Sequence, residues 1–162
     1  MHPTQGLTLI ELMMALAVVA ILAAMAAPSF GSQVNRQRLK AAAEGLAADL
    51  AEARFEAARR GQALHVGFNG GADWCYTIAT VSACDCRTAQ PCQLKTVRSA
   101  DLPGVQLLQA ADTSFDTQGA SPAPGIALWQ SARGEQLRVA STSMGRARIC
   151  APAGPVSGHP AC

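Results

Sequence analysis

The stretch "GLTLIELMMALAVVAILAAMAAPSF", Gly6 to Phe30, decides the architecture of this chain. Leu7 to Ala27 comprises 21 residues, and Glu11 is the only ionisable side chain among them. As a helix that rises about 1.5 Å per residue, the segment is about 31 Å long, which matches the hydrocarbon core of a bilayer. A carboxylate inside a bilayer costs about 2.5–3.5 kcal/mol on insertion scales. The sequence therefore predicts a membrane-spanning helix whose single glutamate needs a partner.

Two simpler interpretations leave features of this segment unexplained. A secretory signal peptide could end at the small-residue site "AMA", Ala24 to Ala26, but the start "MHPTQG" carries no Lys or Arg. A plain single-span anchor accounts for the length of the segment. Neither interpretation explains a carboxylate at position 11.

The same stretch resembles the prepilin signature of type IV pilins and type II secretion pseudopilins. In this resemblance residues 1–6 are a polar leader, and a prepilin peptidase cuts between Gly6 and Leu7. Glu11 is then the fifth mature residue and Pro28 the twenty-second, where pilins often have a helix-bending proline. The resemblance implies a single-pass protein of the inner membrane whose carboxy-terminal domain lies in the periplasm. It also implies that Glu11 neutralises the N-methylated terminal amine of a neighbouring pilin subunit during filament assembly.

A helical period continues after Pro28, although the sequence becomes polar. We expect one long helix over residues 7–60, kinked at Pro28 because proline removes a backbone donor. Gly61 is suited to end this helix. Within the amphipathic half, residues 28–60, charged residues mostly occupy a solvated face. Apolar residues spaced three and four apart form one stripe: Leu39, Ala43, Leu46, Leu50, Ala53 and Ala57.

Short runs typical of β-strands fill residues 61–162, the predicted periplasmic domain. They are "ALHVGF", "WCYTIAT", "CQLKTVR", "VQLLQ", "IALWQ", "QLRVAST" and "RARIC". We expect a small antiparallel sheet covered by the helical stripe, an α+β architecture that is also the pilin fold. "SFDTQGAS", Ser114 to Ser121, resembles a strand-and-turn element of the GspH/FimT subgroup, although Asp116 and Gly119 could simply make a turn.

All six cysteines follow the apolar segment, which favours disulfides in an oxidising compartment. They are Cys75, Cys84, Cys86, Cys92, Cys150 and Cys162. We expect a bond between Cys150 and Cys162 that closes the Pro- and Gly-rich tail. The four central cysteines are expected to form two disulfides, with the pairing left open. A zinc site is the alternative, although the C-x-C spacing is unlike the usual one.

Basic residues concentrate at the carboxy-terminal end of a chain whose net charge is only +2. From Arg133 onward there are four arginines against the single acid Glu135. In "SMGRARIC", Arg146 and Arg148 are two apart, so on a strand they project from one face, and Gly145 leaves room for the backbone. Guanidinium groups suit phosphates because each offers a planar fork of donors.

The stretch "GRAR" resembles the GRxR motif of FimT-type minor pilins, which bind DNA during natural transformation. This resemblance implies DNA-binding roles for Gly145, Arg146 and Arg148. Secondary basic candidates, on electrostatic grounds, are Arg133, Arg138 and Lys95. Two alternatives stay open: the arginines could guard an edge strand, or they could contact neighbouring subunits or exported protein in a type II secretion pseudopilus. A pilus-priming subunit that does not bind DNA is a further alternative.

Nothing in the sequence indicates an enzyme. His2, His65 and His159 have no nucleophile elbow, phosphate loop or metal-ligand spacing beside them. We therefore expect no catalytic residue, no cofactor and no metal, and partners limited to pilin subunits, the prepilin peptidase, the inner membrane and DNA.

Overall fold

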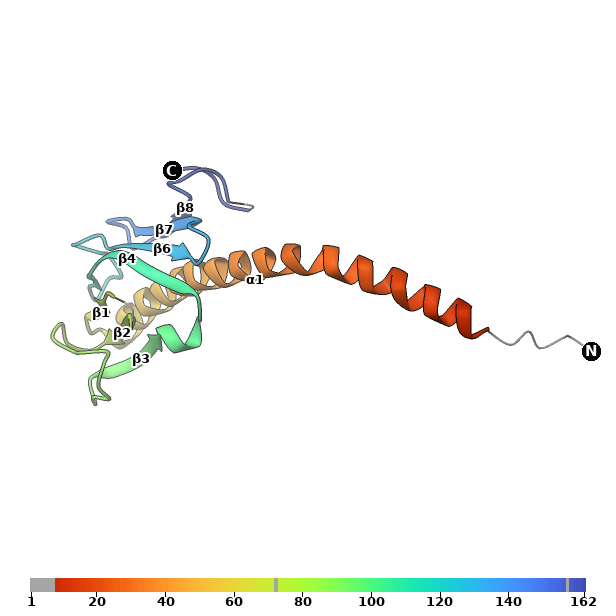
Figure 1. Cartoon of the computed structure of the whole chain (residues 1–162). Coiled ribbons are helices and arrows are strands. Elements are labelled where there is room, and N and C mark those ends of the chain that lie inside the picture. The colour runs from red at the N-terminus through yellow and green to blue at the C-terminus, as the bar shows by residue number, and fades with distance from the viewer. Residues whose placement is uncertain (1–7, 72, 157) are drawn as a thin grey trace, which may run out of the picture. The chain divides into compact units, whose positions relative to one another are not determined.

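The computed structural model describes residues 8–71, 73–156 and 158–162, with the side chains of all of these except residues 25–29. One long helix, α1 (Leu9–Arg60), is followed by eight strands (Figure 1). The chain divides into two compact units, residues 1–34 and 35–162, and α1 contributes to both. The predicted long helix is confirmed to within two residues at its start.

The first unit contains the amino-terminal part of α1. Its large apolar side chains from Leu9 to Leu22 are each 52–79% exposed. Within the described residues, no helix combines the length and the apolar character that crossing a membrane requires. The span over residues 7–27 stays a prediction. The predicted cleavage site, Gly6 and Leu7, lies outside the described residues. Helix α1 includes Pro28, and the kink expected there stays a prediction.

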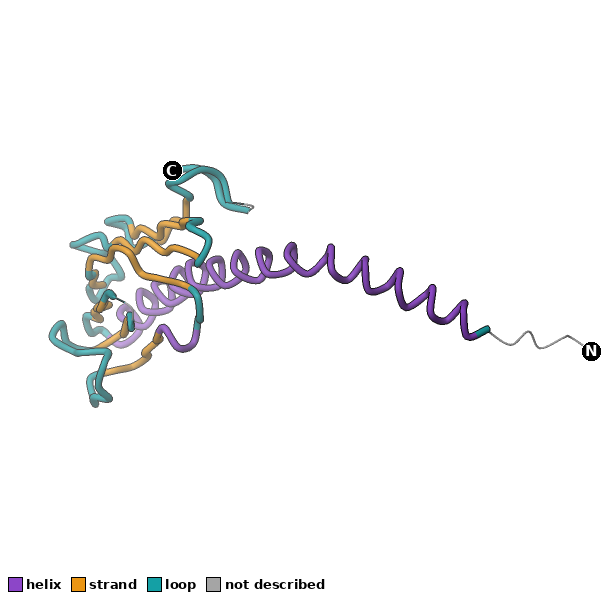
Figure 2. Tube along the Cα trace, in the orientation of Figure 1, coloured by secondary structure: helices purple, strands orange, loops and turns teal. Residues whose placement is uncertain are grey.

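The second unit contains two four-stranded antiparallel sheets. Sheet A has the order β3 (Gln93–Arg98), β2 (Cys75–Ala79), β1 (Leu64–Asn69) and β5 (Thr113–Phe115). Sheet B has the order β4 (Val105–Ala111), β6 (Ile126–Ser131), β7 (Gln136–Ser141) and β8 (Ala147–Cys150). A short 3-10 helix, η1 (Ser99–Asp101), lies between β3 and β4 along the chain (Figure 2).

The predicted α+β class is confirmed, but strands expected in one small sheet form two. Each of the seven predicted runs coincides with most of one strand, and β5 is a further short strand that ends in the first two residues of "SFDTQGAS". The chain leaves sheet A after β3, begins sheet B with β4, and returns through β5, which pairs with β1. A bridge between Gly71 and Leu107 also links the sheets. Strand patterns report local periodicity, and they do not show which strands pair.

The predicted helical stripe forms one side of the hydrophobic core. Leu39, Ala43 and the other four stripe residues are each at most 4% exposed. They pack with Trp74, which directly precedes β2, and with Phe115 of β5 and Trp129 of β6. Figure 1 shows the carboxy-terminal part of α1 against the strands of this unit. All the buried residues of this core lie between Leu39 and Val156. A fragment that begins at Gly31 therefore retains the complete core.

Gly61 ends α1 as expected. Its φ of +61° is accessible to glycine without the steric cost of a Cβ. The Gln62 N–H bonds to the Ala57 carbonyl at 3.2 Å, and the Gly61 N–H bonds to the Ala58 carbonyl at 3.4 Å. This pair of bonds is a Schellman motif, which satisfies carbonyls that the helix would otherwise leave open.

Three disulfides stabilise the second unit. The predicted bond between Cys150 and Cys162 is confirmed, and the central cysteines pair as Cys75–Cys86 and Cys84–Cys92. The zinc alternative is wrong, because each of the four central sulfurs is bonded in one of two disulfides and is not a free thiolate. The Cys75–Cys86 bond ties the loop between β2 and β3 to β2. All five residues of β2 are buried.

Candidate functional site

The hairpin formed by β7 and β8 carries the two arginines of the "GRAR" stretch. Arg146 precedes β8, and its carbonyl accepts a hydrogen bond from the Thr142 N–H at 2.9 Å. Ala147 and Ile149 pack toward the core, whereas Arg146 and Arg148 are exposed. The two arginines therefore project from the same outer face. Because β8 is the last strand of sheet B, the two arginines lie at the edge of the sheet.

A third arginine shares this face. Arg138 on β7 is opposite Cys150 of β8, and Ala140 is opposite Arg148. Diagonal neighbours of this kind have Cα atoms about 7–8 Å apart in antiparallel sheets. We call Arg138, Arg146 and Arg148 the arginine patch. The four strands of sheet B contain no Asp or Glu, so the patch has no acidic neighbour on its own strands.

The members of the patch differ in how free their guanidinium groups are. Among the described residues, the side chains of Arg146 and Arg148 have no hydrogen-bond or ion-pair partner. Arg138 is half-buried, and its Nη2 lies 3.7 Å from Sγ of Cys150. Its buried Nε has no partner in the described part of the chain. Arg146 and Arg148 are therefore the members best placed to bind an anion from solution.

Gly145 fixes the backbone that leads into Arg146. Its φ is +72°, and a Cβ at this position would lie 2.5 Å from the Gly119 carbonyl oxygen and 2.9 Å from Cδ of Arg54. Arg54, from α1, donates from Nε to the same Gly119 oxygen at 3.0 Å. We call Arg54, Gly119 and Gly145 the glycine junction. Three segments far apart in the sequence meet there, and no spacing pattern in the sequence signals this.

The turn predicted at "FDTQG" forms and presents Gly119 to the junction. Asp116 Oδ1 accepts the N–H groups of Gln118 and Ala120 at 2.9 and 2.8 Å. The Ser121 N–H bonds to the Ser143 carbonyl at 2.9 Å, which fastens this loop to the β7–β8 turn. The loop and the hairpin therefore support each other.

Two secondary candidates lie away from the patch. Arg133 is in the β6–β7 turn, at the opposite end of β7 from Arg146. Lys95 is on β3 of sheet A, and its Nζ lies 2.7 Å from Oδ1 of the buried Asp49. The hydrogen bond to Asp49 raises the pKa of Lys95. We leave both residues out of the arginine patch, because Arg133 lies at the far end of the β6–β7 hairpin and Lys95 lies on the other sheet.

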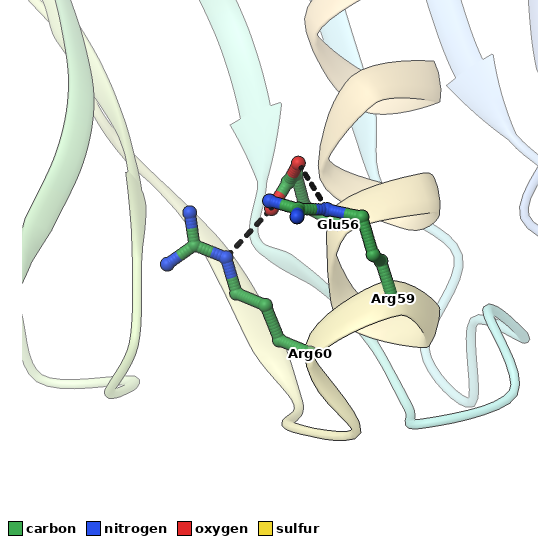
Figure 3. A network of polar contacts seen from close by, with 3 residues as sticks. All are labelled: Glu56, Arg59 and Arg60. Atoms are coloured by element: carbon green, nitrogen blue, oxygen red, sulfur yellow. Dashed lines mark hydrogen bonds and ion pairs between the residues drawn. The ribbon is translucent and has the colours of Figure 1, made fainter.

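The arginines at the carboxy-terminal end of α1 are paired with an acid. Glu56 accepts hydrogen bonds from Arg59 at 3.0 and 2.8 Å and from Arg60 at 2.6 Å (Figure 3). These bonds lower the pKa of Glu56 to about 2. Glu56 is thus ionised near neutral pH, and its negative charge offsets part of the positive charge of Arg59 and Arg60. Arg59 and Arg60 therefore serve as matched controls for the unpaired arginines of the patch.

Of the remaining candidates, Glu11, His65 and His159 lie among the described residues, on separate segments of the chain. Glu11 lies in the first turn of α1, where its N–H bonds to Oγ1 of Thr8 at 3.4 Å, and the Thr8 side chain caps the helix. His159 Nε2 lies 3.2 Å from Glu44 Oε1, and His65 is on β1. His2 falls outside the described residues. In the described segments, no cluster of three His, Cys, Asp or Glu side chains could hold a metal ion.

Two families match this chain. Residues 1–27 match the prokaryotic N-terminal methylation motif, and residues 42–154 match type II transport protein GspH. No protein with a curated description matches the chain.

Solved structures share the fold at low sequence identity. The type IV minor pilin FimU of Pseudomonas aeruginosa is 19% identical, with a TM-score of 0.57 over 73% of this chain and 95% of that one. The minor pseudopilin EpsH of the Vibrio cholerae Type 2 Secretion System is 18% identical, with a TM-score of 0.54 over 72% of this chain and 98% of that one.

A long helix packed on antiparallel sheets is also the fold of the minor pilin FimU and the minor pseudopilin EpsH, and in this chain a methylation motif covers the start of the helix. The match over residues 42–154 covers most of the chain, which therefore belongs to the type II transport protein GspH family. The family predicted from the prepilin signature and the "SFDTQGAS" element is thereby confirmed.

Proposed function

We propose that this protein is a minor pilin of a type IV pilus that binds DNA for uptake in natural transformation. A prepilin peptidase cleaves it between Gly6 and Leu7. Residues 7–27 hold it in the inner membrane with the carboxy-terminal domain in the periplasm until it joins the filament. The family and the methylation motif support the filament role. The observation that carries the DNA role is the exposure of Arg146 and Arg148 at the edge of sheet B, where neither side chain has a partner among the described residues.

The chemistry of the patch suits the phosphates of a nucleic acid backbone. Each guanidinium offers a fork of donors that matches two phosphate oxygens. Phosphates carry no sequence information, so binding is sequence-independent and weakens as salt rises. In a plot of the logarithm of the DNA-binding constant against the logarithm of the salt concentration, each phosphate neutralised on duplex DNA makes the negative slope steeper by about 0.9. We call this slope the salt slope.

The double variant Arg146→Ala/Arg148→Ala should lose most of the affinity for duplex DNA. Because two phosphate contacts are removed, the salt slope should become shallower by about 1.8. The measurement is fluorescence anisotropy of labelled duplex DNA across a salt series, with the disulfide-bonded fragment Gly31–Cys162.

The matched control for this experiment is Arg59→Ala/Arg60→Ala. It removes the same formal charge from the same unit, but these arginines are already paired with Glu56. The control should bind nearly as wild type does. Equal losses in the two double variants would mean that net charge alone is measured, and the DNA role of the patch would then be rejected.

Glu11→Ala should exclude the protein from the filament while leaving its membrane insertion intact. Glu11 is the carboxylate within an otherwise apolar helical segment, and a neighbouring terminal amine would neutralise it on assembly. Immunoblots of sheared filaments and of inner membranes measure the two pools. The control is Glu52→Ala, which changes a solvent-exposed glutamate on the same helix. Wild-type amounts of Glu11→Ala protein in filaments would contradict this role.

A second candidate function is that of a pseudopilin in a type II secretion system. The match to type II transport protein GspH and the structural likeness to EpsH favour it. In that case, or in a pilus-priming subunit, the arginine patch would contact neighbouring subunits or exported protein. Wild-type protein that fails to bind DNA, in a genome with secretion genes beside this one, would favour the second candidate.

A further inference from the structure

Arg54 reaches the β7–β8 turn from α1 with its side chain already held in place. Nε donates to the Gly119 carbonyl at 3.0 Å. The absence of a Cβ on Gly145 lets the Arg54 stem pass against the backbone that precedes Arg146, since a Cβ there would lie 2.9 Å from Cδ and 3.1 Å from Nε. An arginine fixed in this way loses less conformational entropy on binding a ligand than a free one does.

The far end of this side chain is available to a ligand. Among the described residues, the bond to Gly119 is the one polar contact of the Arg54 side chain. Arg54 lines a shallow surface groove together with Phe55, Ala58 and Gln118. The carboxylate on the neighbouring turn, Asp116, accepts two backbone N–H groups. In the described part of the chain neither terminal nitrogen of Arg54 has a hydrogen-bond or ion-pair partner, so both can donate to an incoming anion.

We propose that Arg54 is a third phosphate-binding residue of the DNA site, held in position by the glycine junction. The inference rests on the proposed function, since it assigns a new residue to the same site. The DNA backbone would then contact Arg148 and Arg146 at the edge of sheet B and Arg54 on α1. A site built from two elements holds the DNA backbone at a defined angle to the hairpin, which two arginines at one edge of the hairpin do not provide.

The test compares Arg54→Met and Arg54→Lys in the full chain, purified in a non-ionic detergent. Methionine keeps an unbranched stem without the charge, so duplex DNA binding should weaken and the salt slope should become shallower by about 0.9. Lysine keeps the charge but lacks the Nε donor to Gly119, so the slope should stay near the wild-type value. The control is Arg59→Met, five positions along the helix and paired with Glu56 (Figure 3), which should leave the slope unchanged.

Each other outcome overturns the inference. If Arg54 only positions the turn, methionine and lysine should reduce affinity equally and shift the slope alike. If Arg54→Met retains wild-type affinity and slope, Arg54 makes no phosphate contact. In both cases the loss of binding in Arg146→Ala/Arg148→Ala would leave the proposed function standing. Failure of the wild-type chain to bind DNA would reject the proposed function itself.

Discussion

Replacing Gly145 with alanine is expected to destabilise the globular unit by about 2–5 kcal/mol. The left-handed backbone costs a residue with a Cβ about 1–2 kcal/mol, and overpacking costs about 1–3 kcal/mol more. The overpacking arises because the new Cβ would lie 2.5 Å from the Gly119 carbonyl oxygen. Urea denaturation of the fragment Gly31–Cys162, followed by circular dichroism, measures the loss.

Gly134→Ala separates the two parts of this effect. Gly134 also has a positive φ, +86°, in a turn of sheet B, but nothing lies within 4 Å of a Cβ built on it. It should therefore lose only the backbone contribution of about 1–2 kcal/mol. Equal losses in the two variants would show that the glycine junction is not tightly packed. That result would also weaken the argument that Arg54 is held in place.

Asp49→Ala is expected to destabilise the same unit by about 1–3 kcal/mol, the cost of leaving a buried polar group without its partner. Asp49 is 6% exposed on α1. It accepts a hydrogen bond from the Tyr76 hydroxyl at 2.9 Å and one from Lys95 Nζ at 2.7 Å. Burial and the nearby carboxylate raise the pKa of Tyr76, so the hydroxyl stays protonated as a donor. The removal of Asp49 leaves that hydroxyl buried and unpaired.

The double variant Asp49→Ala/Tyr76→Phe tests this reason directly. Phenylalanine has no hydroxyl to leave unsatisfied, so the double variant should unfold at a higher urea concentration than Asp49→Ala alone. A double variant that is less stable than Asp49→Ala would mean that the hydroxyl finds another partner. The loss of stability in Asp49→Ala would then come from lost packing and not from an unpaired hydroxyl.

The pH dependence provides a second check on this pair. The hydrogen bond to Asp49 raises the pKa of Lys95 above its usual 10.5. A group with a raised folded pKa stabilises the fold fully below its unfolded pKa, and the contribution disappears as the pH rises through the folded value. The stability gap between wild type and Asp49→Ala should therefore be constant near neutral pH. It should narrow above about pH 10.5.

Local pattern was enough to predict the elements. The period of the stripe from Leu39 to Ala57 predicted a helix with one buried face, and alternation with β-branched residues predicted the strands. Gly61 marked the end of α1 because glycine adopts a positive φ without strain. The arginine pair was also readable, because positions 146 and 148 must share a face on any strand. Each of these predictions depends on neighbours within a few residues.

Predictions that depend on distant neighbours were incomplete or wrong. The sequence allowed Asp49 to be one of many charges on a solvated helical face, whereas the fold buries it against Tyr76 and Lys95. Lys95 was a candidate for the basic site, and the structure places it on sheet A, bonded to that acid. Local spacing cannot report such contacts, because they form between segments that only the folded chain brings together.

The sequence by itself determined the family, the long helix with its apolar start, the strand-rich domain, the bond between Cys150 and Cys162, and the exposed arginine pair. Only the tertiary structure decided that the strands divide into two sheets, that the central cysteines pair as 75–86 and 84–92, and that Arg54 meets Gly119 and Gly145. The physical reason is the range of each interaction. Periodicity and turn chemistry act over a few residues, whereas strand pairing, disulfide choice and close packing depend on the positions of segments that are distant in sequence.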